Sequence, residues 1–131
     1  MCATEVGVDL VSITQMTAML EASGQSYRDQ CWTVDEQVYC GGSAARYAAR
    51  WAAKEAAMKA LGHGIGEIDP VDIEVVGVEG QRPVLRLSGT ARAFAEAAGV
   101  ELTVSMSHEG DIATAVVVAT RCCTDHVCAH A

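Results

Sequence analysis

The chain has 131 residues, half of them hydrophobic, and a formal net charge of −8. This length fits one domain, and the hydrophobic content excludes a disordered chain. The acidic balance argues against nucleic-acid binding, which needs a basic surface. No apolar stretch reaches the roughly 20 residues that cross a bilayer. The N-terminus has no basic segment followed by an apolar run, so we expect a cytoplasmic protein without a membrane partner.

The first predicted element is a short buried strand at Glu5–Val11, whose apolar run is interrupted by Asp9. A helix is expected from about Ile13 to Ala22, ending near Gly24, and a short helical turn at Val34–Tyr39. A buried carboxylate needs a partner. Asp9 therefore either caps the helix that follows or holds a charged ligand.

The clearest element is an Ala-rich helix at Ala44–Leu61, with Ser43 as its N-cap and Gly62 after its last residue. A broad face of small residues predicts close packing on a sheet or another helix. Glu55 is either half of a surface pair with Lys59 or a carboxylate held beside the packed face. Two stripes at four-residue spacing border this face: Arg46, Arg50 and Lys54, and Trp51, Glu55 and Lys59.

The second half of the chain predicts two hairpins and a helix. The expected strands are Val71–Val78, Val84–Leu87, Leu102–Ser107 and Ile112–Ala119, with a helix at Thr90–Ala98 and the last hairpin turning at 108–111. The fold class is therefore α+β, a largely antiparallel sheet packed with the long Ala-rich helix. We expect residues 1–120 to form this domain and the Cys- and His-rich residues 121–131 to form a mobile tail, with a zinc site there as the alternative.

Asp9, Glu55 and the cations of the long helix together predict a site for Mg2+ and phosphate. Two carboxylates, phosphate oxygens and waters are a usual ligand set for Mg2+. The loop Gly62–Gly66, which follows the helix, would add flexible backbone N–H donors.

Three segments of the chain form a set of motifs in a fixed order. They are Val6–Ile13, Arg50–Gly66, and Val104–His108 followed by Ala113–Ala119. This set resembles the holo-acyl-carrier-protein synthase type of 4'-phosphopantetheinyl transferase over nearly the whole chain. The resemblance implies the fold of that family, a homotrimer with active sites at subunit interfaces, coenzyme A as co-substrate and Mg2+ as cofactor.

The resemblance also implies a reaction and its residues. The arm of coenzyme A would pass to a serine of an apo acyl carrier protein from fatty-acid or polyketide biosynthesis, releasing adenosine 3',5'-bisphosphate. Asp9 and Glu55 match the metal ligands, and Lys59 matches the lysine that contacts the phosphates; these three are the implied catalytic residues. The positions matching the coenzyme A site are Arg50, Lys59, Gly62, Arg82, Pro83 and His108.

One position departs from the family pattern. Gln15 stands where the family usually has Arg, and Arg28 is the single cation between residues 13 and 30. We therefore expect weaker electrostatic steering of the carrier. The expected docking face is instead apolar and consists of Met16, Met19 and Leu20.

Two other functions stay open at this point. The first is a catalytically silent module that keeps the fold and docks a carrier. The second is a nucleotide-binding module that uses a phosphate clamp of Arg46, Arg50 and Lys54.

Overall fold

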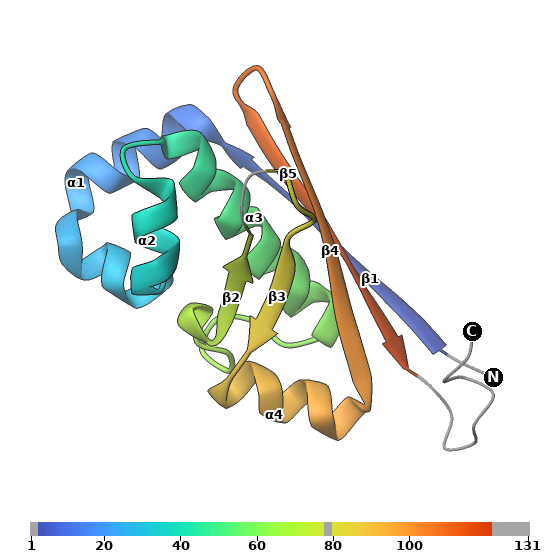
Figure 1. The fold of residues 1–131 in the computed structure, drawn as a ribbon. Coiled ribbons are helices and arrows are strands. Elements are labelled where there is room, and N and C mark those ends of the chain that lie inside the picture. Colours follow the sequence, from blue (N-terminus) through green and yellow to red (C-terminus); the bar gives the residue numbers. More distant parts are fainter. Residues whose placement is uncertain (1–2, 78–79, 122–131) are drawn as a thin grey trace.

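The computed structural model describes residues 3–77 and 80–121, which form two antiparallel sheets (Figure 1). The larger sheet has the strand order β1-β5-β4. Its strands are β1 (Ala3–Ser12), β4 (Val100–Glu109) and β5 (Ile112–Arg121). The smaller sheet pairs β2 (Ile73–Val76) with β3 (Val84–Leu87). The predicted α+β class with antiparallel pairing is confirmed, with the first hairpin forming a sheet of its own.

The helices are α1 (Ile13–Cys31), α2 (Val34–Cys40), α3 (Ala44–Leu61) and α4 (Gly89–Ala98), with a single 3-10 turn, η1 (Pro70–Asp72). Figure 1 shows α3 packed along the larger sheet, with α1 and α2 together on one side and α4 near the far end of α3. Within residues 3–77 and 80–121, the helices are all too short or too polar to span a membrane.

The small-residue face of α3 packs directly on the larger sheet. Ala52, Ala53 and Ala56 are fully buried there against Ala115 and Val117. The contact with β1 is closest at Gly7. A Cβ atom at Gly7 would collide with the carbonyl oxygen of Ala56 and lie 2.8 Å from the backbone nitrogen of Ala60. The predicted close packing of this helix face is confirmed, and it is a contact between two backbones.

The opposite face of the larger sheet is apolar and exposed. Val6, Val8 and Leu10 on β1 are 59%, 51% and 66% exposed, so the prediction that this strand is buried is wrong. Strand β1 is an edge strand covered by α3 on one face only. We call Val6, Val8, Leu10, Ile112 and Val116 the outer sheet face.

A second core lies between α1, α2 and α3. Met16 and Leu20 are buried in it beside Trp32 and Tyr47. The predicted apolar docking face is therefore wrong for Met16 and Leu20, because their side chains hold α1 against the domain. Met19 is exposed, as that prediction requires.

Lys54 is buried in an ion pair and does not reach the surface. Its Nζ lies 2.8 Å from Oε1 of Glu36, and both side chains are fully buried. The ammonium also donates to the carbonyl oxygens of Pro70 and Ile73, while Glu36 accepts from the backbone of Val75. Burial lowers the pKa of Lys54, and the Glu36 carboxylate opposes that shift. The phosphate clamp that included Lys54 is thus excluded, because this ammonium has no free donor direction.

Several element boundaries differ from those expected. Helix α1 is interrupted at Gly24 (φ 70°, ψ −163°), where an end was predicted, but it resumes and continues to Cys31. The predicted strand from Val71 is shorter because the chain makes a 3-10 turn through Asp72, and its predicted end at Val78 lies outside the described residues. The expected tail also lies outside them beyond residue 121.

The Gly7 contact gives a stability prediction. Gly7→Ala should lower the free energy of unfolding by about 3 kcal/mol or more, because overpacking here sets one backbone against another. The measurement is urea unfolding followed by circular dichroism at fixed protein concentration. Gly42→Ala is the control, since a Cβ there meets nothing within 4 Å. Equal stabilities of the two variants would contradict the close packing.

Candidate active site

The contact between β1 and α3 brings Asp9 and Lys59 together. The Nζ of Lys59 lies 3.2 Å from Oδ1 of Asp9 and donates to the carbonyl oxygen of Val8 at 2.9 Å. Lys59 keeps 55% of its side chain exposed, whereas Asp9 keeps 18%. The cap of α1 is Ser12, whose hydroxyl accepts from the backbone of Gln15, so the alternative role of Asp9 as that cap is excluded.

Glu55 lies one helical turn before Lys59 on α3. It lines a cavity of about 290 Å³ together with Asp9, and we call this the carboxylate cavity. The pKa of Glu55 is raised, first by burial and then by the Asp9 charge, while Lys59 opposes the shift. In the part of the chain that the structure describes, Lys59 pairs with Asp9 and forms no salt bridge with Glu55, so the predicted helix-surface pair is wrong.

The two carboxylates fit a hard divalent cation. Their oxygens are the ligands that Mg2+ prefers. Burial and then the Asp9 charge raise the pKa of Glu55, and a positive ion between the carboxylates would offset both effects. Among the described residues no group of three or more Asp, Glu, His or Cys side chains forms a metal cage. A cation here would therefore complete its shell with waters or substrate oxygens, which is usual for Mg2+.

A second group of predicted residues lines a different cavity, of about 400 Å³, which we call the arginine cavity. Arg50 is only 4% exposed, and its guanidinium carbon lies 4.1 Å from the centre of the Tyr39 ring. Its Nε has no hydrogen-bond partner among the described residues. The guanidinium carbon of Arg46 lies 4.8 Å from the centre of the same Tyr39 ring. His108 also lines this cavity. A buried, unpaired guanidinium donor is suited to an anion.

The hairpin of β4 and β5 positions His108. The prediction places His108 in the turn, but it lies on β4 opposite Ala113. The end of this hairpin is tied to the start of α1 because Asp111 accepts from the Thr14 backbone at 2.8 Å and from the Ser12 hydroxyl at 2.8 Å. These bonds lower the pKa of Asp111. His108 is therefore presented on a fixed strand.

Lys59, Gly62, Arg82 and Pro83 are not among the lining residues of either cavity. Gly62 ends α3 in the left-handed conformation (φ 78°, ψ 19°), three residues after Lys59. Arg82 is exposed and Pro83 is half-buried in the turn before β3. The carboxylate cavity and the arginine cavity share no lining residue.

Three aromatic residues at these cavities were not predicted as site residues. Tyr27 and Trp51 line the carboxylate cavity, and Tyr39 lines the arginine cavity. Trp51 shares a helix stripe with Glu55, which was a usable signal. Tyr27 follows the interruption at Gly24, so its position could not be predicted from a helix that was expected to end there.

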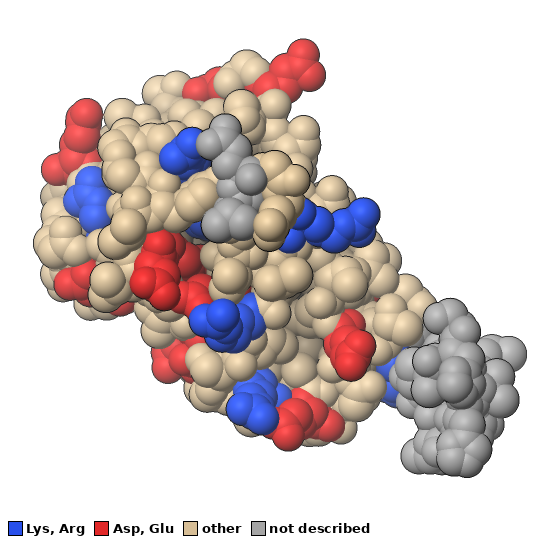
Figure 2. All heavy atoms as spheres, in the orientation of Figure 1, with Lys and Arg blue, Asp and Glu red and all other residues tan. Residues whose placement is uncertain are grey.

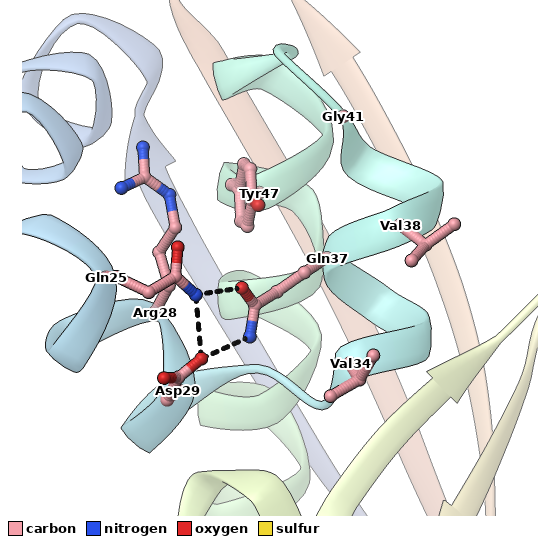
Figure 3. Close-up of a pocket in the computed structure, with 8 residues that line it drawn as sticks. All are labelled: Gln25, Arg28, Asp29, Val34, Gln37, Val38, Gly41 and Tyr47. Atoms are coloured by element: carbon pink, nitrogen blue, oxygen red, sulfur yellow. Dashed lines mark hydrogen bonds between the residues drawn. The ribbon is translucent and has the colours of Figure 1, made fainter.

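A groove of about 520 Å³ between α1 and α2 holds no predicted site residue (Figure 3). Gln25, Asp29 and Gln37 bond one another across it, with Gln25 Nε2 donating to both Asp29 Oδ1 and Gln37 Oε1 at 2.8 Å. These polar groups already satisfy one another.

Figure 2 shows basic and acidic side chains interspersed over one face of the molecule, so anion recognition there depends on local clusters rather than on a broad basic patch.

Comparison with known proteins gives concordant results. A family model described as the 4'-phosphopantetheinyl transferase superfamily matches residues 5–121. Holo-acyl-carrier-protein synthases from Geobacter metallireducens and Herpetosiphon aurantiacus are each 42% identical to the chain, over 88% and 86% of it and 95% and 94% of their own lengths. The coenzyme A complex of such a synthase from Helicobacter pylori superposes with a TM-score of 0.77 at 29% identity, covering 87% of this chain and 98% of that one. The apo structure of the synthase from Chronobacterium ammoniagenes superposes with a TM-score of 0.82 at 33% identity, covering 94% of this chain and 100% of that one.

The raised pKa of Glu55 gives a pH prediction. The folded state binds the Glu55 proton more tightly than the unfolded state, so the charged carboxylate destabilises the fold above its folded pKa and has no such effect below its unfolded pKa. Without metal, Glu55→Gln should therefore be more stable than the parent chain at pH 7, and the difference should shrink as the pH falls toward 4. Urea unfolding in a chelator measures this. Glu96→Gln, in an exposed pair with Arg92, is the control and should show no such gain. A loss of stability in Glu55→Gln at pH 7 would contradict the argument.

Proposed function

Because this chain belongs to the 4'-phosphopantetheinyl transferase superfamily, we propose that the carboxylate cavity and the arginine cavity are two halves of its active site. The chain transfers the 4'-phosphopantetheine arm of coenzyme A to a serine of an apo acyl carrier protein and releases adenosine 3',5'-bisphosphate. The observation that carries the residue assignment is the meeting of Asp9, Glu55 and Lys59 where β1 crosses α3.

Asp9 and Glu55 in the carboxylate cavity, and Lys59 paired with Asp9, have roles that follow from their charges. Asp9 and Glu55 would hold Mg2+, which when bound neutralises the charge of the pyrophosphate. Lys59 is exposed, and among the described residues its ammonium bonds only Asp9 and the Val8 carbonyl, so it can turn to the phosphate oxygens and stabilise their developing charge. Glu55, which lines the carboxylate cavity with Asp9, is the side chain we propose as the acceptor of the serine proton.

The arginine cavity would hold the nucleotide end of coenzyme A. This end carries the phosphates that lie away from the reacting bond, and Arg50 and His108 supply donors for them. The unpaired Nε of Arg50 supports an anion at this position. Gly62, whose left-handed conformation ends α3 three residues after Lys59, would let the backbone turn beside the phosphates, and Arg82 and Pro83 would border the adenine.

We propose that a homotrimer brings the two cavities together, one from each of two neighbouring subunits. The outer sheet face supports this assembly, because a contiguous apolar sheet surface is costly when exposed to water. The separation of the two cavities on a single chain supports it independently. Each active site would then consist of Asp9, Glu55 and Lys59 from one subunit and Arg50 and His108 from the next.

The carrier is proposed to dock near the start of α1, beside the carboxylate cavity. Gln15 and Met19 both line that cavity, and Met19 is exposed. Neither carries charge, so docking should depend less on carrier acidity than it does where Arg occupies the position of Gln15. We propose a carrier of fatty-acid or polyketide biosynthesis, acting in the cytoplasm, where the free thiols of Cys31 and Cys40 would stay reduced.

The metal assignment predicts the behaviour of two variants. Asp9→Ala and Glu55→Ala should each lower transfer by at least about 100-fold while the circular dichroism spectrum is kept. The assay mixes protein, coenzyme A, Mg2+ and an apo carrier, and follows the mass of the carrier. A chelator should stop the reaction of the parent chain and added Mg2+ should restore it. Glu96→Ala is the surface control. Parent-level transfer by either cavity variant would refute the assignment.

The shared active site predicts complementation between two inactive variants. Asp9→Ala and His108→Ala should each be inactive alone. When they are denatured together in equal amounts and refolded, one of the three sites in each mixed trimer, and so about a quarter of all sites, would combine an intact carboxylate cavity with an intact arginine cavity. Recovery of activity in the mixture, against none when each variant is refolded alone, is the expected result. If each chain holds a complete site, mixing restores nothing.

A further inference from the structure

Asp111, in the turn between β4 and β5, binds the start of α1 with its carbonyl oxygen and with both carboxylate oxygens. The carbonyl oxygen accepts from the backbone of Ile13 at 2.8 Å. Oδ1 accepts from the backbone of Thr14 at 2.8 Å and from the Thr14 hydroxyl at 2.6 Å, while Oδ2 accepts from the Ser12 hydroxyl at 2.8 Å. One residue of the hairpin therefore ties two elements that are far apart in the sequence.

This tie completes the N-terminus of α1. The first N–H groups of a helix have no partner within the helix. Asp111 accepts from those of Ile13 and Thr14. The Ser12 hydroxyl, which donates to Asp111, accepts from the N–H of Gln15. The first turn of α1 contains no acidic residue of its own, so the Asp111 carboxylate supplies the negative charge that a helix N-terminus favours.

The same residue links the two cavities of one chain. On the helix side, Ser12 and Gln15 line the carboxylate cavity. On the strand side, Ser107 and His108 line the arginine cavity, just before the turn that holds Asp111. Strand β4 is the outer strand in the order β1-β5-β4, so its end is held by pairing with β5 and, beyond the strand, by the Asp111 bonds. A shift of Asp111 would therefore move residues of both cavities.

We infer that Asp111 is a positioning residue for two active sites at once. The inference rests on the proposed function, in which the two cavities of one chain belong to two different active sites of the trimer. On the helix side, Asp111 fixes the start of α1, where the carrier would dock. On the strand side, it fixes His108, which would contact coenzyme A in the neighbouring site.

The metal pair is held independently of this tie. Asp9 lies opposite Ala115 in the pairing of β1 with β5, and its carbonyl oxygen accepts from the Thr114 hydroxyl at 2.9 Å. Lys59 bonds its carboxylate. Loss of the Asp111 bonds should therefore weaken the binding of both substrates and leave the chemical step unchanged, so that KM rises while kcat is kept. A simple loss of folded protein would lower kcat instead.

The first test measures both constants in the variant Asp111→Ala. KM for coenzyme A and KM for the apo carrier should each rise by about tenfold, because small displacements of binding groups are costly. The value of kcat should stay within about threefold of that of the parent chain. Asp29→Ala is the matched control. Asp29 is also an exposed carboxylate that joins two elements by side-chain bonds, and its loss should change neither KM.

Thr14→Val keeps the inference testable if Asp111→Ala does not fold. This variant loses the hydroxyl bond to Asp111 and keeps the backbone bond, so both KM values should rise by a smaller factor, about threefold. Combined with Asp111→Ala, it should raise neither KM further, because the shared bond is already absent.

Mixed trimers separate the two sides of Asp111. When Asp9→Ala and His108→Ala chains are refolded together, the recovered site takes its carboxylate cavity from the His108→Ala chain and its arginine cavity from the Asp9→Ala chain. Asp111→Ala added to the Asp9→Ala chain should therefore raise KM for coenzyme A alone. Added to the His108→Ala chain, it should raise KM for the carrier alone.

The possible results distinguish this inference from the proposed function. Parent values of both KM in Asp111→Ala, or a fall in kcat with both KM unchanged, would overturn the inference and leave the proposed function standing. A rise in both constants whichever chain of the mixed trimer carries Asp111→Ala would also overturn it. If mixing Asp9→Ala with His108→Ala chains restores no activity, the shared site of the proposed function is wrong, and the inference fails with it.

Discussion

The contact between the backbone of β1 and the backbone of α3 is the constraint on which the active site depends. Gly7 leaves no room for a Cβ atom against Ala56, so strand and helix approach as closely as two backbones can. Side chains alternate along a strand, and Asp9 therefore faces the same helix two residues beyond Gly7. At that distance it reaches Lys59 and influences Glu55. A larger residue at Gly7 would separate the carboxylates before any catalytic residue had changed.

Two cations of α3, Lys54 and Lys59, differ in burial because they have different neighbours. Lys54 points into the space between α2 and β2, where Glu36 and two carbonyl oxygens surround it. Lys59 lies at the edge of β1 and stays exposed. A buried ion pair contributes little net stability but is costly to break, so Lys54 fixes how α3 sits against α2 and β2. The residues that flank it on the helix, Arg50 and Glu55, are held in place as a result.

The sequence allowed the prediction of elements whose signals are local. The bounds of α3 and its Ser43 cap were correct because alanine content, a capping hydroxyl and a following glycine all act within a few residues. The burial of β1 was predicted wrongly. Its apolar residues suggested a strand buried on both faces, whereas α3 covers only one of them. The resumption of α1 after Gly24 depends on packing around Trp32, which is a tertiary contact. For the candidate site, motifs indicated which residues matter, but the separation of Arg50 and His108 from Asp9 needed the fold.

Arg50 and Lys59 present two kinds of cation to one substrate. Arg50 is packed on the Tyr39 ring before any anion arrives, so its rotamer freedom is lost when the chain folds. Binding an anion then costs little further side-chain entropy, and the fixed guanidinium favours an anion whose oxygens match the positions of its donors. Lys59 keeps its freedom until the substrate is present. One cation is therefore suited to recognising a part of the donor that stays still, and the other to following charge that moves as the phosphorus changes partners.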